Sequence, residues 1–172
     1  MNIFNPFSAR TLIFFGWGFS VLAIAGAWTF QSLGYEPCEL CYLQRVPHYT
    51  LILLGAVALL ARWNWLAWPG ALIAAVASGL GAYHTGVERH WWPGPASCTG
   101  GDVSGMSPDE LLAQLTAAPI VRCDEIPWRL SDLIPWEALD LTMANFNALG
   151  SFVFIFVWLA AALKAGQKPG RG

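Results

Sequence analysis

The four cysteines are the residues of this chain best suited to chemistry. Two of them lie in the short motif Cys38 to Cys41, which has the spacing C-x-x-C. A bridge across two intervening residues closes a tiny ring and constrains little of the unfolded chain. C-x-x-C pairs are more often redox-active, with one thiol acidified. We therefore interpret this pair as a redox-active dithiol.

The other two cysteines, Cys98 and Cys123, lie farther along the chain, and four cysteines allow three pairings. The local pairing joins Cys38 to Cys41 and Cys98 to Cys123. Three interpretations compete: static disulfides that brace an outer region, a zinc site of four thiolates, and a relay of two exchanging dithiol/disulfide pairs. A zinc site favours a second close-spaced pair, which Cys98 and Cys123 do not form. The relay is therefore favoured, and no metal is expected.

Arg45 follows Cys41 by four residues. If this stretch is helical, the two side chains share one face and lie one turn apart. A guanidinium beside a thiol favours the nucleophilic thiolate. The alternative is an interfacial arginine whose charged end reaches toward water. Pro47 disfavours helical angles at the residue before it, so we expect the helix to begin or kink there.

The composition predicts a membrane protein that must hold these residues at its surface. Apolar residues make up 56% of the 172 residues and charged residues 12%, where soluble proteins carry about 25% charged residues. Mean hydropathy is +0.48. Four apolar windows have lengths near the roughly 20 residues of a membrane-spanning helix. They cover about 11–30, 44–62, 65–87 and 141–163.

These windows predict an all-α fold with a single membrane domain over residues 1–172. We expect a bundle of four transmembrane helices, with loops at about 31–43 and 88–140 and short helices in the longer loop. Helices buried in a soluble bundle are the alternative, but such helices show a polar face and these windows show none.

Charge distribution predicts the orientation. The side of the termini holds basic residues and no acidic residue, whereas all 11 acidic residues fall on the other side. The positive-inside rule then puts both termini in the cytoplasm and both cysteine-bearing loops outside. In a bacterium the outer space is the periplasm, where disulfides persist. A nucleic-acid partner is not expected, because the chain has no basic patch.

The long loop carries its own signals. Ser107, Pro108 and Glu110 form a capping-box pattern, which predicts a short helix through about residue 117. Residues 126–136 mix aromatic and charged side chains, which suits a segment on the membrane surface, with an ordinary loop as the alternative. Asn145 and Asn147 place two amides in or near the fourth span, where polar side chains are often functional or bind neighbouring helices.

The stretch Pro37 to Arg45 resembles the P-C-x-L-C-x-x-x-R signature of the disulfide bond formation protein B (DsbB) family. Members of that family are bacterial inner-membrane thiol:quinone oxidoreductases. The resemblance covers nearly the whole chain: four spans, a C-x-x-C after the first, and a second cysteine pair between the third and fourth. This order differs from the vitamin K epoxide reductase family, whose loop cysteines precede its C-x-x-C. The stretch 131–139 looks longer than the family pattern.

The resemblance implies catalytic roles for the four cysteines. Cys98 and Cys123 would form an outer disulfide that meets a periplasmic DsbA-type thiol oxidase, with Cys98 as the site of the mixed disulfide. Cys38 and Cys41 would reoxidise that pair.

The resemblance also implies an electron acceptor, a membrane quinone such as ubiquinone or menaquinone, to which Cys41 would pass electrons. Arg45 would lie near the quinone oxygen. His84, at the outer end of the third span, would be linked to the quinone site, with a histidine satisfied at the interface as the alternative. The location implied is the bacterial inner membrane.

Two other functions remain open. One is a non-enzymatic scaffold in the membrane lipid, with structural disulfides in its outer loops. The other is a membrane thiol reductase that carries electrons outward, which the lack of a cysteine on the side of the termini disfavours.

Overall fold

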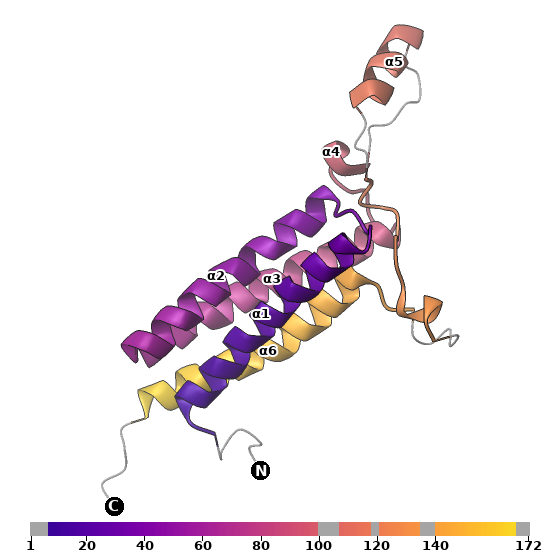
Figure 1. Ribbon diagram of the computed structural model, residues 1–172. Coiled ribbons are helices and arrows are strands. Elements are labelled where there is room, and N and C mark those ends of the chain that lie inside the picture. The colour runs from indigo at the N-terminus through magenta and orange to yellow at the C-terminus, as the bar shows by residue number, and fades with distance from the viewer. Residues whose placement is uncertain (1–6, 100–106, 118–120, 135–139, 168–172) are drawn as a thin grey trace, which may run out of the picture.

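Four long helices form an up-and-down bundle in the computed structural model, which describes residues 7–99, 107–117, 121–134 and 140–167 (Figure 1). They are α1 (Ala9–Ser32), α2 (Glu39–Ala61), α3 (Ala67–Glu88) and α6 (Met143–Gly166). Helices α1 and α3 each pack against both α2 and α6. A short 3-10 turn, η1 (Asn64–Leu66), joins α2 to α3. The all-helical prediction is confirmed.

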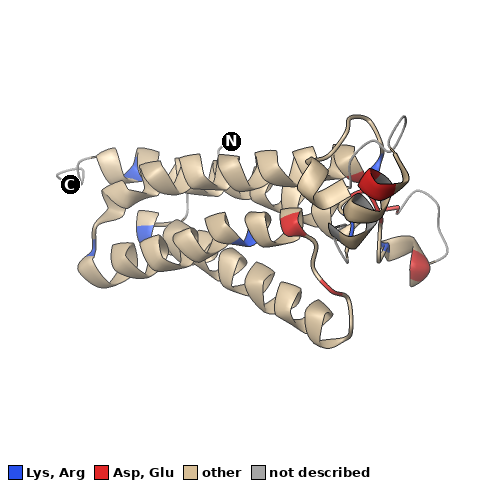
Figure 2. Cartoon of the chain, turned by 90° about the horizontal axis from the view of Figure 1, so that it is seen from above, with Lys and Arg blue, Asp and Glu red and all other residues tan. Residues whose placement is uncertain are grey.

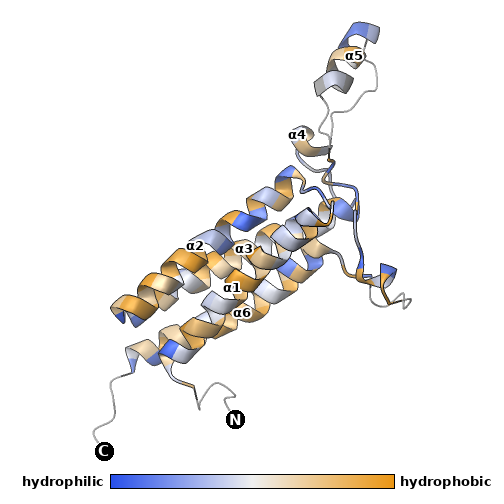
Figure 3. Cartoon of the chain, viewed as in Figure 1, coloured by the Kyte–Doolittle hydropathy of each residue, from blue (hydrophilic) through white to orange (hydrophobic). Residues whose placement is uncertain are grey.

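The four helices are long and apolar enough to cross a membrane, judged by length and composition. Most of their length is coloured as hydrophobic residues (Figure 3), and many large apolar side chains are exposed. Leu22, Leu60 and Leu72, for example, are 73%, 87% and 69% exposed. Such exposure is expected of side chains that meet lipid rather than water. The chain is therefore a multi-pass membrane protein with four candidate spans.

The two ends of the bundle differ in the segments and the charges that lie there. The described residues nearest the two termini lie at one end, and the long segment between α3 and α6 lies at the other (Figure 1). Acidic residues gather at that second end (Figure 2). The segment carries α4 (Ala96–Thr99), α5 (Pro108–Ala117) and η2 (Leu130–Asp132). This arrangement confirms a loop with short helices between the third and fourth spans.

Helix α5 begins as its sequence predicts. The Ser107 backbone N–H donates to Glu110 Oε2 at 2.8 Å, and the Glu110 N–H donates to Ser107 Oγ at 3.4 Å. The first of these bonds holds the pKa of Glu110 below its usual value, because it favours the carboxylate.

The apolar core lies toward the end of the bundle near the termini. Trp158 is fully buried there, among alanines of α2, α3 and α6. Gly16 of α1 and Gly70 of α3 face its ring: a Cβ at Gly16 would lie 2.6 Å from Trp158 Cε2, and one at Gly70 would lie 2.7 Å from Cδ2. Larger residues at either position would therefore displace the tryptophan.

One local expectation differs from the structure. Helix α2 begins at Glu39 rather than near residue 44, and Pro47 lies inside it. Membrane helices tolerate an internal proline when neighbouring groups compensate for the lost hydrogen bond. In the aromatic segment 126–136, Trp128 packs on Phe30 and Phe146 with centroid distances of 5.1 and 6.3 Å, and the position of this segment on the membrane surface stays a prediction. Its residues 135 and 136, and the stretch 135–139 of the longer segment, lie outside the described residues.

Candidate active site

The two cysteine pairs meet at the loop end of the bundle. Cys98 and Cys123 form a disulfide with a Cα–Cα distance of 5.4 Å, and both side chains are fully buried. Cys38 and Cys41 are not bridged, and their sulfur atoms lie 3.0 Å apart. Cys38 Sγ, Cys123 Sγ and a ring nitrogen of His84 lie within 4.8 Å of one another. Cys38 and Cys123 are thus the two sulfurs through which the pairs face each other.

The start of α2 positions the close pair. Cys38 is the N-cap residue, with extended backbone angles, and its Sγ accepts the Cys41 backbone N–H at 3.3 Å. The C-x-x-C motif therefore occupies the helix N-terminus, where the helix dipole favours a thiolate. A hydrogen bond to Cys41 and burial raise the pKa of the Cys38 thiol. The proton of the reduced pair therefore resides on Cys38, which donates to the Cys41 sulfur.

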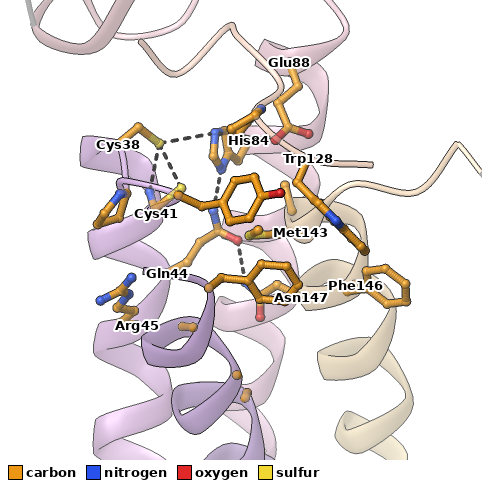
Figure 4. A pocket seen from close by; sticks show the side chains of 18 of the residues that line it. Cys38, Cys41, Gln44, Arg45, His84, Glu88, Trp128, Met143, Phe146 and Asn147 are labelled. Atoms are coloured by element: carbon orange, nitrogen blue, oxygen red, sulfur yellow. Dashed lines mark hydrogen bonds and ion pairs between the residues drawn. The ribbon is translucent and has the colours of Figure 1, made fainter. Parts of the chain in front are cut away.

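His84 is buried beside Cys38 (Figure 4), and its ring also lies close to the sulfur atom of Cys123. Its Nε2 lies 3.2 Å from the Cys123 carbonyl oxygen and 3.6 Å from Cys38 Sγ. Its Nδ1 lies 2.6 Å from Gln44 Nε2. Both ring nitrogens thus have protein partners, and one of them borders Cys38 and Cys123.

Glu88 is a buried carboxyl group next to His84. Its Oε1 lies 4.0 Å from His84 Nε2, and its Oε2 accepts a hydrogen bond from Thr142 Oγ1 at 2.6 Å. We did not select Glu88 from the sequence. The signal was present, because Glu88 follows His84 by four residues and so shares its helix face.

Asn147 joins α6 to α2 inside the bundle. Its Nδ2 donates to Gln44 Oε1 at 2.6 Å, and its Oδ1 accepts from His48 Nε2 at 2.8 Å. Asn145 caps α6 together with Thr142 and donates to Thr85 of α3 at 2.9 Å. The prediction that these two amides bind neighbouring helices is confirmed.

Gln44 and His48 are site residues that the sequence reasoning missed. They lie four positions apart on α2, so they occupy one face. Polar side chains in an otherwise apolar span are the signal that points to them.

Arg45 lies one turn after Cys41 in a continuous helix, as the spacing predicts. Its Nη1 donates to Gln31 Oε1 at 2.9 Å. The guanidinium carbon also lies 5.0 Å from the Tyr42 ring centroid and 5.9 Å from that of Trp28. These contacts hold a permanent positive charge beside the cavity described next.

A cavity of about 740 Å³ extends from the cysteines into the bundle. Helix α1 forms one wall and diverges from the other helices toward the loop end (Figure 2). The walls are mainly apolar, which is typical of small-molecule sites of this size. The polar and sulfur-bearing side chains that line it include Cys38, Cys41, Gln44, Arg45, His48, His84, Glu88 and Asn147. The cavity therefore brings Cys41, Arg45 and His84 to one space.

Comparison with known proteins places this arrangement in a family. The family model described as "Disulfide bond formation protein DsbB" matches residues 9–161, which is most of the chain. Disulfide bond formation protein B of an Acidovorax species is 27% identical over 83% of this chain and 80% of its own length. The protein of the same description from Paracidovorax citrulli is 28% identical over 86% of this chain and 82% of its own length.

A "probable disulfide formation protein" of Oceanobacillus iheyensis is 32% identical over 47% of this chain, which spans 57% of that relative. No solved structure matches the chain significantly. The family match covers the first three candidate spans, most of the fourth, and all four cysteines. With its two cysteine pairs at one end of four candidate spans, the chain belongs to the disulfide bond formation protein B family.

Proposed function

We propose that this chain is a membrane thiol:quinone oxidoreductase that reoxidises a periplasmic dithiol oxidase of the DsbA type and passes the electrons to a membrane quinone. The observation that carries the proposal is the placement of Cys38 Sγ within 4.8 Å of Cys123 Sγ, while its partner Cys41 lines the cavity. One pair can thus exchange with the other, and the second pair borders a space that suits an apolar acceptor.

The exchange begins at the outer disulfide. A thiolate of the partner oxidase attacks Cys98 Sγ, forms a mixed disulfide and releases the Cys123 thiolate. In the oxidised form of the close pair, Cys123 then attacks Cys38 Sγ. A Cys38–Cys123 bridge forms, and Cys41 leaves as a thiolate at the helix N-terminus. The short separation of Cys38 from Cys123 supports this order over attack on Cys41.

The second half restores both bridges. The second cysteine thiolate of the partner attacks the partner's first cysteine sulfur in the mixed disulfide. The partner's own disulfide forms, the oxidised partner departs, and the Cys98 thiolate is released. Cys98 attacks Cys123, so the outer bridge forms again and Cys38 leaves as a thiolate. Cys38 and Cys41 together then give up two electrons as their own disulfide forms. The partner has lost two electrons and two protons in one cycle.

The cavity residues fit a quinone. A quinone is a flat apolar ring with two carbonyl acceptors, and when bound it supplies an acceptor for two electrons and two protons. The apolar walls suit the ring, and the guanidinium of Arg45 is a donor that cannot lose its proton. Arg45 would orient a carbonyl oxygen, and Cys41 would face the ring. The alternative role for Arg45, reaching toward water, has less support, because the residue is 8% exposed and its guanidinium donates a hydrogen bond to Gln31.

The orientation belongs to the same proposal. Basic residues lie at the helix ends near the termini: Arg10 is in the first turn of α1, Arg62 caps the end of α2, and Lys164 is in the last turn of α6. Acidic residues gather at the other end of the bundle (Figure 2). The positive-inside rule then assigns the termini to the cytoplasm and both cysteine pairs to the periplasm of a bacterial inner membrane.

Thiol trapping tests the proposal against a scaffold with structural disulfides. The oxidised protein is mixed with a reduced DsbA-type oxidase, with and without a soluble quinone, and its free thiols are alkylated. We expect reduced cysteines to accumulate without quinone and to reoxidise with it. Cys98→Ala should lose this turnover, since the attack site is gone. Bridges that stay oxidised in both conditions, or full turnover of Cys98→Ala, would refute the relay.

A further inference from the structure

Gln44 and Asn147 form a directional chain of hydrogen bonds that ends at the reacting sulfurs. We propose that these two amides are positioning residues: they hold His84 with its Nε2 hydrogen directed at the junction of the two cysteine pairs, toward the Cys123 carbonyl oxygen and Cys38 Sγ, so that His84 assists the exchange between Cys38 and Cys123. This inference rests on the relay proposed above and adds to it a donor at one sulfur and the residues that orient this donor.

Backbone carbonyls fix the direction of both amides. Gln44 Nε2 lies 3.3 Å from the Leu40 carbonyl oxygen, which can only accept, so the NH₂ group of Gln44 must point there. Asn147 Nδ2 lies 3.4 Å from the Ala77 carbonyl oxygen, which sets its amide in the same way. The two assignments agree, because Asn147 Nδ2 then donates to Gln44 Oε1 at 2.6 Å.

The Gln44 amide in turn selects the tautomer of His84. Its NH₂ group lies 2.6 Å from His84 Nδ1, which must therefore accept. A neutral imidazole that accepts at Nδ1 carries its hydrogen on Nε2. That nitrogen lies 3.2 Å from the Cys123 carbonyl oxygen and 3.6 Å from Cys38 Sγ. The hydrogen is therefore directed at the junction of the two cysteine pairs.

Residues deeper in the bundle hold Asn147, the first amide of this chain of hydrogen bonds, in place. Asn147 Oδ1 accepts hydrogen bonds from His48 Nε2 at 2.8 Å and from Ser151 Oγ at 3.2 Å. Both donors are buried in the spans, at 4% and 1% exposure. Water does not compete readily for these groups, so the amides keep one orientation. Each residue in this series, from His48 to His84, therefore donates its hydrogen bond toward the cysteine pairs.

The step that needs this donor is the departure of Cys38. When the Cys98 thiolate attacks Cys123, the Cys98–Cys123 bond forms, the Cys38–Cys123 bond breaks, and the electron pair remains on Cys38 Sγ. No net oxidation occurs in this step. A buried thiolate beside Cys41 is a poor leaving group, and a donor at its sulfur stabilises the charge as it develops.

The same tautomer bears on metal binding. Cys38, His84 and Cys123 have the residue types of a metal site, and their ligand atoms lie close together. A protonated Nε2 offers no lone pair to a metal ion. The amide chain therefore commits His84 to donating toward sulfur.

Nitrogen NMR of the histidine rings tests the tautomer directly. The chain has three histidines, so ring-labelled protein in micelles gives few signals, and His84→Ala assigns the one of interest. We expect His84 to carry its hydrogen on Nε2 in the wild type. In Gln44→Met, which keeps the size but loses the donor, we expect both tautomers. A wild-type hydrogen on Nδ1 would overturn the proposal, whatever the variants do.

The second measurement is the rate at which reducing equivalents pass between the pairs. Fully oxidised, quinone-free protein is mixed with a small dithiol, and the thiols of each pair are alkylated after an acid quench. We expect transfer to the close pair to slow about tenfold in Gln44→Met, the size expected for one lost hydrogen bond, while the initial reduction of Cys98–Cys123 is unchanged. Asn147→Leu should show a smaller slowing.

Ser78→Ala is the matched control, because Ser78 Oγ donates to the Ala148 carbonyl oxygen at 3.0 Å between α3 and α6 but lies outside the amide chain. It should keep the wild-type rate and tautomer. Equal rates and tautomers in wild type and Gln44→Met would overturn this inference and leave the relay intact. Absence of transfer between the pairs in the wild type would instead overturn the proposed function.

Discussion

At Gly81 the backbones of α3 and α6 pack closely, and a single methyl group there should destabilise the bundle. A Cβ at Gly81 would lie 2.6 Å from Ala148 N, 2.9 Å from Ala148 Cα and 3.1 Å from Ala144 O. All three are backbone atoms of α6, so no flexible side chain can turn aside. Since carbon contacts are favourable at about 3.5–4.0 Å, the helices must separate by roughly 1 Å in Gly81→Ala.

The expected cost follows from overpacking. Inserting a methyl group into a well-packed interface costs about 1–3 kcal/mol. Replacing glycine in a helix by alanine also lowers the entropy lost on folding, a gain of about 0.5–1 kcal/mol. Gly79→Ala isolates that gain, because a Cβ at Gly79 meets nothing within 4 Å. The difference between the two variants is therefore about 1–3 kcal/mol, with Gly81→Ala the less stable.

The assay is reversible denaturant unfolding in detergent micelles, followed by helix content for both variants and the wild type. The separation should also stretch the hydrogen bond from Asn145 to Thr85, which lies one turn away and joins the same two helices. Equal stability of Gly81→Ala and Gly79→Ala would show that the helices do not pack this closely, and the argument from the glycine contact would fail.

Two further predictions concern charged residues. Arg45→Ala should raise the apparent KM for quinone about tenfold, the scale of a lost hydrogen bond to a charged group, and should change the KM for the partner oxidase less. Steady-state kinetics with each substrate varied in turn measure both constants. An unchanged KM for quinone would reject the role of Arg45. Hydrogen bonds from Arg89 and Arg129 hold the pKa of Asp140 below its usual value, so the stability they contribute is present above the unfolded pKa and is lost as the pH falls through the lower folded value. Asp140→Asn should therefore lose less stability than the wild type on acidification from about pH 6 to about pH 3 in micelle unfolding experiments, and identical losses would contradict the assignment.

The four spans were predictable because each needs only length and apolar composition, which the sequence displays directly. The start of α2 was not. Cys38 accepts the Cys41 N–H and so begins the helix five residues earlier than the apolar window, a capping role that thiols fill less often than hydroxyls or carboxylates. Pro47 suggested that the helix begins or kinks there, but α2 begins at Glu39 and contains Pro47, which membrane helices tolerate when neighbouring groups compensate for the lost hydrogen bond.

The site was predictable where one residue carries the chemistry. The C-x-x-C spacing and the position of Arg45 pointed to the close pair, and the resemblance supplied the roles of Cys98 and Cys123. The polar network was not predictable, because its members come from separate helices. Gln44 and Asn147 meet only after α2 and α6 are placed, and nothing in the sequence states which polar residue of one span faces which of another.

The burial of Trp158 between Gly16 and Gly70 gives the molecule a mechanical asymmetry. The packing around Trp158 holds α1 against α3 and α6 at that end. At the other end α1 diverges from its neighbours (Figure 2), so α1 has more freedom to move there. We therefore expect lateral pressure within the leaflet at the loop end to act on that end of α1 more than on its end near Trp158. We expect the acyl-chain composition of that leaflet to change the separation between the loop end of α1 and the neighbouring helices. Bilayers of graded composition would vary this separation without changing a residue.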